Sequence, residues 1–567
     1  PVDTILTSGG QTPLVHLWRH AGGKLKWCEM RQAFLPDTNP MSMVAVGAAN
    51  GTFDMDTALA EARAAGSGKA RPSGSEEPPR YHLTPLWPSP GGKGRQWIDF
   101  QHDVTLKDIE LAARENYVSV EHLKRYTTLG MASDQGKTSN MAGLAAMATL
   151  QGKPIPEVGT TTFRPPFVPV PLEIYHGHHK GQHWHPPKRL ALEAEHRVAG
   201  AALGEYGGWL RPAWYGDGGM AARVRDEVLT ARDSAGLFDA SPLGKIEVMG
   251  PDAEQFVNFV YYNTIKTLKP GRIRYGFMLS EGGIVFDDGV IARVDTNRFI
   301  ISCSSSHVDG VRTHLEAWRQ DGNDPDRIFI HDMTQHWATL TVTGPKARDV
   351  LGTLGLKADI SKDALPHMAF VETHWQSTPL RIARVSFSGD LSFELSIRRS
   401  QAQALWHVLR NAGAAPVGLE AMAVMRAEKG YIMIGKDTDG ETMPHDLGFT
   451  APRDKKSTAF IGDRSLHMDV ANDPTRKQLV GLAVASSAPM LPIGAHAVTN
   501  DAKPRSLGYV TSSYESPTLG HAIAMGLIEN GRARMGETIT LWHLGNRFAA
   551  TITSPVFFDP KGERLHA

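Results

Sequence analysis

The spacing of apolar and polar positions divides the chain into regions with different periods. Helical spacing predicts helices over 56–65 and 140–150, with a further helical stretch between them. Thr105 and Asp108 form a capping box at the start of that stretch. Its apolar stripe consists of Ile109, Ala112, Val120 and Leu123. We therefore expect a small helical domain over residues 97–170.

From about residue 190 the pattern alternates between strands and helices. Strands are predicted at 244–250, 274–279, 283–294, 299–304 and 338–344, and helices at 252–260, 308–318 and 345–354. The run 248–251 and the run 342–345 both join a strand to a helix through Gly-Pro, which suggests two related α+β halves. Residues 478–558 are rich in strands and turns, which favours a small β-barrel or sandwich.

The first segment has the character of an α/β fold. Residues 4–10 and 43–51 are apolar runs that end in glycine turns, and the helix at 56–65 follows the second, which indicates the order strand, glycine turn, helix. The full dinucleotide fingerprint is absent, so a tight turn in an α/β sheet explains these runs equally well. Because the chain starts at Pro1 inside such a pattern, we expect that more chain precedes it. Residues 67–96 are rich in Gly, Pro and Ser, as in a linker.

Composition narrows the classes of function. Of the 567 residues 41% are hydrophobic and 21% charged, and the 60 Lys and Arg balance the 60 Asp and Glu, so no basic excess points to nucleic acid. The two cysteines, Cys28 and Cys303, exclude a disulfide framework and a cysteine-only zinc site, and favour a cytoplasmic protein. We find no signal peptide and no apolar run that would span a membrane.

Two segments have a partial likeness to metal sites. Five histidines lie within residues 176–185, but no carboxylate or cysteine accompanies them at regular spacing. Residues 437–440, Asp-Thr-Asp-Gly, resemble the start of a calcium loop whose later ligands are missing. We interpret the first segment as a solvated loop and the second as a turn, and predict no metal site.

Longer motifs carry a family resemblance. The run from Leu268 to Gly289 is very similar to the folate-binding signature of the glycine-cleavage T-protein family. Residues 387–394, 424–428 and 516–520 also resemble that family, in the same order along the chain. The resemblance covers about 190 to 560 and implies a folate-binding module with a C-terminal barrel.

The preceding region resembles a second family. Residues 99–105, 124–131, 134–140 and 159–166 are similar to the α subunits of heterotetrameric sarcosine oxidases, as are 238–248 and 426–431. Subunits of N-methylglutamate dehydrogenases look similar, so these motifs leave the amine open, and they also leave open whether oxygen is the electron acceptor.

Together these features predict an α+β multidomain protein. Its expected parts are the end of a dinucleotide-binding, disulfide-reductase-like domain (1–66), the linker (67–96), the helical domain (97–170), a T-protein-like folate-binding domain (190–455) and a C-terminal β-barrel (456–567).

The resemblance implies a subunit of a flavin-dependent N-methyl amino acid oxidase or dehydrogenase. Such a subunit would bind tetrahydrofolate and capture the oxidised methyl carbon as 5,10-methylenetetrahydrofolate. It would assemble with β, γ and δ-type subunits, with FMN at a subunit interface, FAD on the β subunit that oxidises the amine, and NAD on the partly missing dinucleotide domain. The alternatives are a non-catalytic folate-binding subunit and a stand-alone aminomethyltransferase.

The resemblance also points to site residues. Asp288 matches the key aspartate of the family motif and is the candidate catalytic group, while Glu394, Phe387 and Tyr275 match residues that hold or line the pterin. Since neighbouring side chains on a strand point to opposite faces, we expect one of Asp287 and Asp288 to enter a pocket and the other to meet solvent.

One position departs from the family pattern. Met422 stands where T-proteins carry an arginine near the folate tail, and we expect Arg426 and Glu428 in the same helix to form a structural ion pair.

Overall fold

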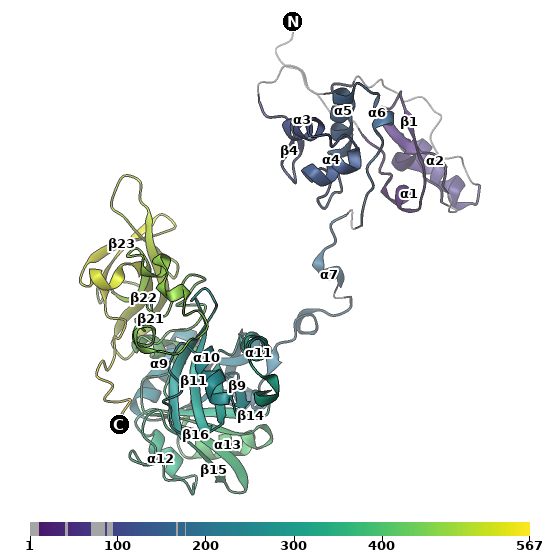
Figure 1. Ribbon diagram of the computed structural model, residues 1–567. Coiled ribbons are helices and arrows are strands. Elements are labelled where there is room, and N and C mark those ends of the chain that lie inside the picture. The colour runs from purple at the N-terminus through teal and green to yellow at the C-terminus, as the bar shows by residue number, and fades with distance from the viewer. Residues whose placement is uncertain (1–10, 40–42, 70–84, 88–93, 166–167, 176) are drawn as a thin grey trace. The chain divides into compact units, whose positions relative to one another are not determined.

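The computed structural model describes the chain except residues 1–10, 40–42, 70–84, 88–93, 166–167 and 176, which are drawn in grey (Figure 1). The predicted run at residues 4–10 lies outside the described residues. The chain forms two units, Pro1–Trp184 and His185–Ala567. Within the described ranges no helix is long and apolar enough to cross a membrane.

The first unit contains a hairpin, short strands and a group of helices. Its strands are β1 (Leu25–Cys28), β2 (Ala33–Pro36), β3 (Trp97–Asp99) and β4 (Val104–Thr105). Its helices are α1 (His16–His20), α2 (Met55–Gly66), α3 (Leu106–Arg114), α4 (Val120–Thr127), α5 (Asn140–Gln151), α6 (Ile155–Val158) and α7 (Leu172–Tyr175), with 3-10 turns η1 (Gly47–Asn50) and η2 (Gly181–His183).

The predicted helical stretch is confirmed. The backbone N–H and the hydroxyl of Thr105 both donate to Asp108 Oδ2 at 2.7 Å, so the capping box begins α3. All four residues of the predicted stripe are buried in one cluster, which Phe34 of β2 joins. The helices therefore pack on the stripe that the sequence indicates.

The predicted strand before the second glycine turn is wrong. Residues 43–46 form no strand, and η1 follows them. The Gly47 N–H donates to Glu61 Oε2 at 2.8 Å, and the Thr52 hydroxyl donates to Glu61 Oε1 at 2.6 Å. This turn is thus held by a side chain of α2 rather than by a neighbouring strand.

The second unit is built on a five-stranded antiparallel sheet, a mixed six-stranded sheet, a three-stranded sheet and a closed barrel. The strand order is β10-β11-β12-β9-β13 in the five-stranded sheet and β15-β16-β17-β14-β8-β18 in the six-stranded sheet. The three-stranded sheet has the order β5-β7-β6, and the barrel the order β19-β22-β21-β20-β23-β24. The predicted C-terminal barrel is confirmed, at the yellow end of the chain in Figure 1.

The strands of this unit are β5 (Lys188–Arg189), β6 (Ala201–Tyr206), β7 (Trp209–Tyr215), β8 (Gly236–Asp239), β9 (Gly244–Met249), β10 (Arg272–Leu279), β11 (Val285–Asp295), β12 (Arg298–Cys303), β13 (Phe329–Asp332), β14 (Trp337–Thr343), β15 (Phe370–Trp375), β16 (Thr378–Ala383), β17 (Ser392–Arg398), β18 (Ala415–Pro416), β19 (Lys477–Ala483), β20 (His496–Val498), β21 (Ser506–Ser516), β22 (His521–Glu529), β23 (Thr538–His543) and β24 (Asn546–Thr553).

The helices of this unit are α8 (Glu193–Val198), α9 (Met220–Asp233), α10 (Ala253–Val260), α11 (Val308–Gln320), α12 (Ala347–Gly352), α13 (Ala402–Asn411), α14 (Leu419–Glu428) and α15 (Ala451–Lys455). Short 3-10 turns are η3 (Pro325–Arg327), η4 (Arg399–Gln401), η5 (Ser465–His467), η6 (Asp469–Asn472) and η7 (Gly531–Arg534).

The two repeated Gly-Pro motifs have the same backbone geometry. Gly250 follows β9 with φ +123°, and Gly344 follows β14 with φ +122°. A Cβ at Gly250 would lie 2.2 Å from the Arg327 carbonyl oxygen, and one at Gly344 2.3 Å from that of Ala231. Only glycine fits both positions, so each half of the unit makes the same strand-to-helix turn.

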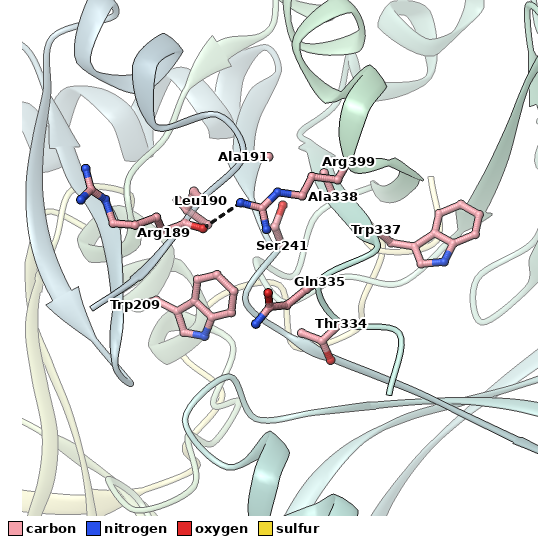
Figure 2. Close-up of a pocket in the computed structure, with 10 residues that line it drawn as sticks. All are labelled: Arg189, Leu190, Ala191, Trp209, Ser241, Thr334, Gln335, Trp337, Ala338 and Arg399. Atoms are coloured by element: carbon pink, nitrogen blue, oxygen red, sulfur yellow. Dashed lines mark hydrogen bonds between the residues drawn. The ribbon is translucent and has the colours of Figure 1, made fainter. Parts of the chain in front are cut away.

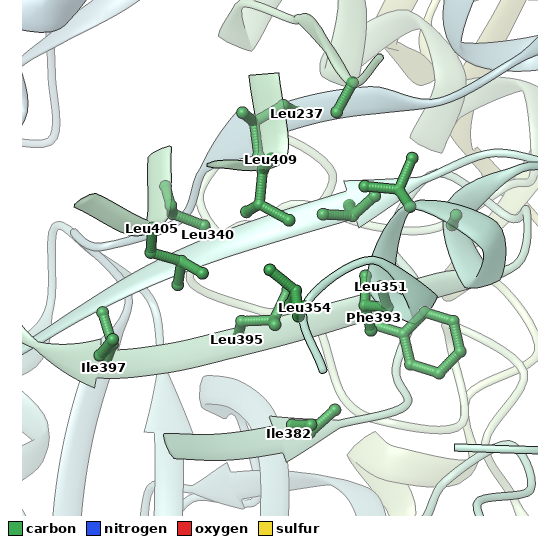
Figure 3. Close-up of a cluster of buried hydrophobic side chains, with 14 of the residues drawn as sticks. Leu237, Leu340, Leu351, Leu354, Ile382, Phe393, Leu395, Ile397, Leu405 and Leu409 are labelled. Atoms are coloured by element: carbon green, nitrogen blue, oxygen red, sulfur yellow. The ribbon is translucent and has the colours of Figure 1, made fainter. Parts of the chain in front are cut away.

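The six-stranded sheet has one apolar and one polar face. Leu340, Leu395 and Ile382 lie opposite one another on β14, β17 and β16 and belong to a buried cluster that also takes in residues of α12 and α13 (Figure 3). Because side chains alternate along a strand, Thr341 and Glu394 point to the other face. That face is partly or wholly buried too, and some of its hydroxyl groups pair with each other, as those of Thr339 and Ser396 do.

Candidate functional site

A cross-strand row on the polar face carries the first candidate residue. In the sheet register Thr341 of β14 pairs with Glu394 of β17 on one side and with Phe238 of β8 on the other. The three side chains therefore stand side by side on one face. The side-chain carboxylate of Glu394, matched to a pterin-holding residue by resemblance, has no hydrogen-bond partner among the residues that the structure describes.

Burial controls the charge of Glu394. It raises the pKa of this carboxyl to about 7, against the favourable field of Lys245. Burial also lowers the pKa of Lys245 to about 8, and its Nζ donates to the carbonyls of Ser241 at 3.0 Å and Leu243 at 2.8 Å. Lys245 is thus held by backbone oxygens, and Glu394 keeps its hydrogen-bonding capacity for something else.

The raised pKa predicts that Glu394→Gln stabilises the unliganded protein at alkaline pH. The folded carboxyl holds its proton up to a pKa of about 7, whereas the unfolded carboxyl releases it near pH 4.3. Stability is therefore lost as pH rises through this window. We expect urea unfolding to show Glu394→Gln more stable than wild type by about 1–2 kcal/mol at pH 8.

The advantage of Glu394→Gln over wild type should shrink towards pH 4. Glu537→Gln is the matched control, because Arg534 holds the pKa of this exposed carboxyl below its usual range and the pH effect should have the opposite sign. An unchanged stability difference between pH 4 and pH 8 would contradict the burial of a charge at Glu394.

The second carboxylate, Asp288, lies on β11 of the five-stranded sheet. The Tyr275 hydroxyl of β10 donates to Asp288 Oδ2 at 2.7 Å, so the structure joins these two candidate residues directly. Burial raises the pKa of Asp288 to about 7, the Tyr275 hydrogen bond opposes that rise, and the neighbouring charge of Asp287 adds to it. A carboxyl with a pKa near neutrality can both accept and return a proton.

Asp287 does not meet solvent, so that part of the prediction is wrong. Its side chain is fully buried and accepts hydrogen bonds from the Ser304 hydroxyl at 2.6 Å and the Ser304 N–H at 3.3 Å. The loop after β12, residues 304–307, covers this face, which the alternation of the strand cannot reveal. Asp287 therefore anchors the loop. His307 of this loop places its Nδ1 3.7 Å from Asp287 Oδ2.

The hydroxyl groups Tyr261 Oη and Thr341 Oγ1 are buried and have no hydrogen-bond partner within the described chain. Burial raises the pKa of Tyr261 well above its usual value, and the charges of Cys303, Asp287 and Asp288 add to the rise. An unpaired buried hydroxyl costs about 1–3 kcal/mol, which a polar ligand would recover. Neither residue stood out in the sequence.

Phe387, the aromatic candidate, stacks on a neighbouring ring. It is 39% exposed, in the loop before β17, and its ring is nearly parallel to that of Tyr431 with 6.4 Å between the centroids. The exposed face leaves room for a flat ligand, as stacking requires. The structure gives no direct contact between Phe387 and Glu394.

The expected ion pair of Arg426 with Glu428 is wrong. Arg426 pairs with Asp437, and Glu428 pairs with Arg232 of α9. The two side chains are only two positions apart on α14, a spacing that does not bring helix side chains together. Met422 of the same helix is buried in an apolar cluster.

Neither partial metal motif forms a metal site among the residues that the structure describes. No group of three or more potential ligands gathers in that part of the chain. Of the histidines, His176 lies outside it, and His185 lies 3.2 Å from Glu205. Asp437 is buried and accepts hydrogen bonds from the hydroxyls of Thr511 and Ser512. Its carboxylate is thereby committed to the protein.

A separate small cavity is too small for a ring ligand. It holds about 10 Å³ and is lined by Arg189, Leu190, Ala191, Trp209, Ser241, Thr334, Gln335, Trp337, Ala338 and Arg399 (Figure 2). The indole N–H groups of Trp209 and Trp337 are buried without a partner in the described structure. The volume suits one water molecule, so this cavity is not the candidate site.

Comparison with protein families places three known domains within residues 93–559. Residues 192–455 match the GCVT N-terminal domain, and residues 477–559 match the glycine cleavage T-protein C-terminal barrel domain. Residues 93–178 match the sarcosine oxidase A3 domain.

Individual relatives agree with these matches. The sarcosine oxidase subunit alpha of Rhizobium meliloti is 37% identical over 100% of this chain and 60% of its own length. The aminomethyltransferase of Streptomyces coelicolor is 31% identical over 62% of this chain and 91% of its own. The chain thus spans about 60% of the sarcosine oxidase subunit that it matches.

A solved structure shares the fold of a large part of the chain. The aminomethyltransferase T of the glycine cleavage system from Bartonella henselae superimposes with a TM-score of 0.58 and 26% identity. The match covers 66% of this chain and 98% of that protein.

Proposed function

The chain belongs to the glycine-cleavage T-protein family and is homologous to sarcosine oxidase α subunits. From this premise we propose that the chain binds tetrahydrofolate and transfers to it the one-carbon group of an oxidised N-methyl amine. The observation that carries the proposal is the partly exposed, partnerless carboxylate of Glu394 on a buried polar face. A carboxylate without a ligand to bind would be expected at the exposed surface, where water satisfies its oxygens.

The candidate residues offer the hydrogen-bonding groups and the aromatic surface that a pterin needs. Glu394 offers two acceptor oxygens to the ring N–H and 2-amino groups, which present paired donors in one plane. Thr341 and Tyr261 add unpaired hydroxyls, and Phe387 adds an exposed aromatic face. A charged carboxylate is the stronger acceptor, so binding should weaken below the Glu394 pKa of about 7.

Asp288 would manage the protons of the transfer. Tetrahydrofolate supplies two nucleophilic nitrogens, N5 and N10, which bind the carbon of the methylene iminium ion as its bond to the amine nitrogen breaks. The two folate N–H protons end on the departing amine, so charge and atoms balance without a further reactant. With a pKa near 7, Asp288 can accept a proton from a folate nitrogen and pass it to that amine. The Tyr275 hydrogen bond fixes the position of the carboxylate.

Oxidation of the amine would take place on another chain. The proposed whole enzyme is a hetero-oligomer that holds flavin, in which this chain receives the iminium before water hydrolyses it to formaldehyde. The homology to sarcosine oxidase subunit alpha supports this arrangement, and N-methyl amino acids are the proposed substrates.

Calorimetric titration of tetrahydrofolate into the full chain, purified with its partner subunits, tests the proposal. We expect Glu394→Ala to weaken binding by about 10- to 150-fold, the value of one or two hydrogen bonds to a charged group. Glu537→Ala, which removes an exposed carboxylate from the barrel, should bind as wild type does. Absence of binding to wild type would refute the proposal, and binding without one-carbon transfer would leave a non-catalytic folate-binding subunit.

A further inference from the structure

Arg211 is a charged side chain without a charged partner, close to the candidate site. It lies on β7, is only 6% exposed, and its guanidinium carbon stands 5.6 Å from the centre of the Phe238 ring. Its only hydrogen bond within the described structure is a long one, from Nη1 to the Ser305 hydroxyl at 3.5 Å. No carboxylate of the described residues lies within ion-pair distance.

The nearby acidic and phenolic groups are engaged elsewhere. Asp239 binds the ring of His196 at 2.9 Å and the backbone N–H of Ser241, also at 2.9 Å. The Tyr206 hydroxyl donates to Glu420 Oε1 at 2.7 Å. Burial lowers the pKa of Arg211 to about 10, so the guanidinium still carries its charge at neutral pH. Burying such a charge without a partner is costly, and a ligand anion would offset the cost.

The guanidinium continues the row that holds Glu394. Arg211 stacks over Phe238, which is followed across the sheet by Thr341 and then Glu394. Two strand spacings separate Phe238 from Glu394, roughly 10 Å. Nη1, Nη2 and Nε are not among the buried atoms that lack a partner, so the donors without a protein partner still reach solvent. A ligand that meets Glu394 at one end can therefore meet Arg211 at the other.

The ring under Arg211 belongs to the buried cluster that contains Met422. Met422, which replaces the arginine that resemblance to T-proteins leads one to expect, belongs to the same buried cluster as Phe238. A charge supplied from β7 would compensate for an apolar side chain on α14. The loop that carries Ser305 is fixed through Ser304 by Asp287.

We propose that Arg211 binds a carboxylate, which belongs either to the folate that Glu394 holds or to the amino acid whose methyl carbon is transferred to that folate. This proposal rests on the proposed function. The planar fork of the guanidinium suits two parallel hydrogen bonds to a carboxylate. The carboxylate has two possible sources, the glutamyl group of the folate and the amino acid whose N-methyl carbon is transferred.

Three titrations into the full chain with its partner subunits separate these sources. The probes are tetrahydrofolate, 6-methyltetrahydropterin, which has no carboxylate, and glycine added to the tetrahydrofolate-loaded protein. If the folate carboxylate is bound, Arg211→Met weakens tetrahydrofolate binding by about 10- to 150-fold and leaves tetrahydropterin binding unchanged. If the amino acid carboxylate is bound, only the glycine affinity falls.

Arg312→Met is the matched control, because Arg312 is an exposed arginine on α11. Arg211→Lys keeps the charge but not the fork and should lose part of the affinity, which tests the proposal even if Arg211→Met fails to fold. Unchanged affinity for both carboxylate probes, or equal losses for tetrahydrofolate and tetrahydropterin, would overturn it. Wild type that binds no tetrahydrofolate would count against the proposed function instead, since the glycine titration needs the loaded protein.

Discussion

Asp288→Asn is expected to slow one-carbon transfer to tetrahydrofolate by about 10²- to 10⁴-fold, the usual contribution of a positioned acid–base group. Asparagine keeps the size of the side chain and can still contact the Tyr275 hydroxyl, which donates to Asp288 at 2.7 Å. It cannot take up a proton. Tetrahydrofolate affinity should therefore stay close to that of wild type, because the loss lies in the transfer step.

The measurement is single-turnover formation of 5,10-methylenetetrahydrofolate by the assembled enzyme, with sarcosine as the probe amine. Formaldehyde should rise in Asp288→Asn as the folate product falls, since water then takes the iminium. Asp295→Asn is the control, because Asp295 is exposed at the end of the same strand. Equal product formation in Asp288→Asn and wild type would remove Asp288 from the proposed chemistry.

The pH dependence of wild type gives a second check on Asp288. Its pKa is about 7, so the carboxylate that accepts a proton is present above this pH and is lost as pH falls through it. At saturating tetrahydrofolate the transfer rate should fall below pH 7. Glu394 has a similar pKa, but protonation of Glu394 lowers the affinity for tetrahydrofolate. That effect does not change the rate when tetrahydrofolate is saturating. Asp288→Asn should remove the pH dependence of the transfer rate.

Local patterns in the sequence predicted the elements well where packing agrees with them. The capping box at Thr105 and the apolar stripe after it use short-range chemistry, and both are present. The Gly-Pro repeats at 250 and 344 correctly predict strand-to-helix turns, because the backbone at each turn leaves no room for a Cβ. Residues 43–46 are apolar but form no strand, and the turn that follows them is held by a hydrogen bond from Gly47 to the distant Glu61, which a local pattern does not show.

The site was less accessible to such patterns. Family resemblance named Asp288, Tyr275 and Glu394, and the structure joins the first two by a hydrogen bond. Strand alternation placed Asp287 and Asp288 on opposite faces, but could not show that a loop covers Asp287. Thr341, Tyr261 and Arg211 carry no motif. They become visible only when sheet register and burial are known. The hydroxyls of Thr341 and Tyr261 then have no partner in the described structure, and Arg211 is a buried charge without a carboxylate beside it.

Glu428→Ala is expected to destabilise the protein by about 3–5 kcal/mol, because it removes one side of a buried ion-pair network. Glu428 is fully buried, with Oε2 at 2.5 Å from Nη2 of Arg232 and Oε1 accepting from the Ser516 hydroxyl at 2.6 Å. Arg232 is 3% exposed and also binds Asp390 Oδ2 at 2.5 Å. Truncation would leave its guanidinium with half of its compensating charge.

The position of this network makes the effect global. Glu428 ends α14, Arg232 belongs to α9, and Ser516 belongs to the barrel strand β21, while the Glu428 carbonyl accepts the N–H groups of Phe557 and Phe558. The carboxylate therefore ties the barrel to the helix that carries Met422, and barrel and sheets should unfold in one transition at lower urea concentration. Glu537→Ala, at an exposed pair, should cost at most about 1 kcal/mol. A loss of similar size in both variants would show that the buried network adds no more stability than a surface pair.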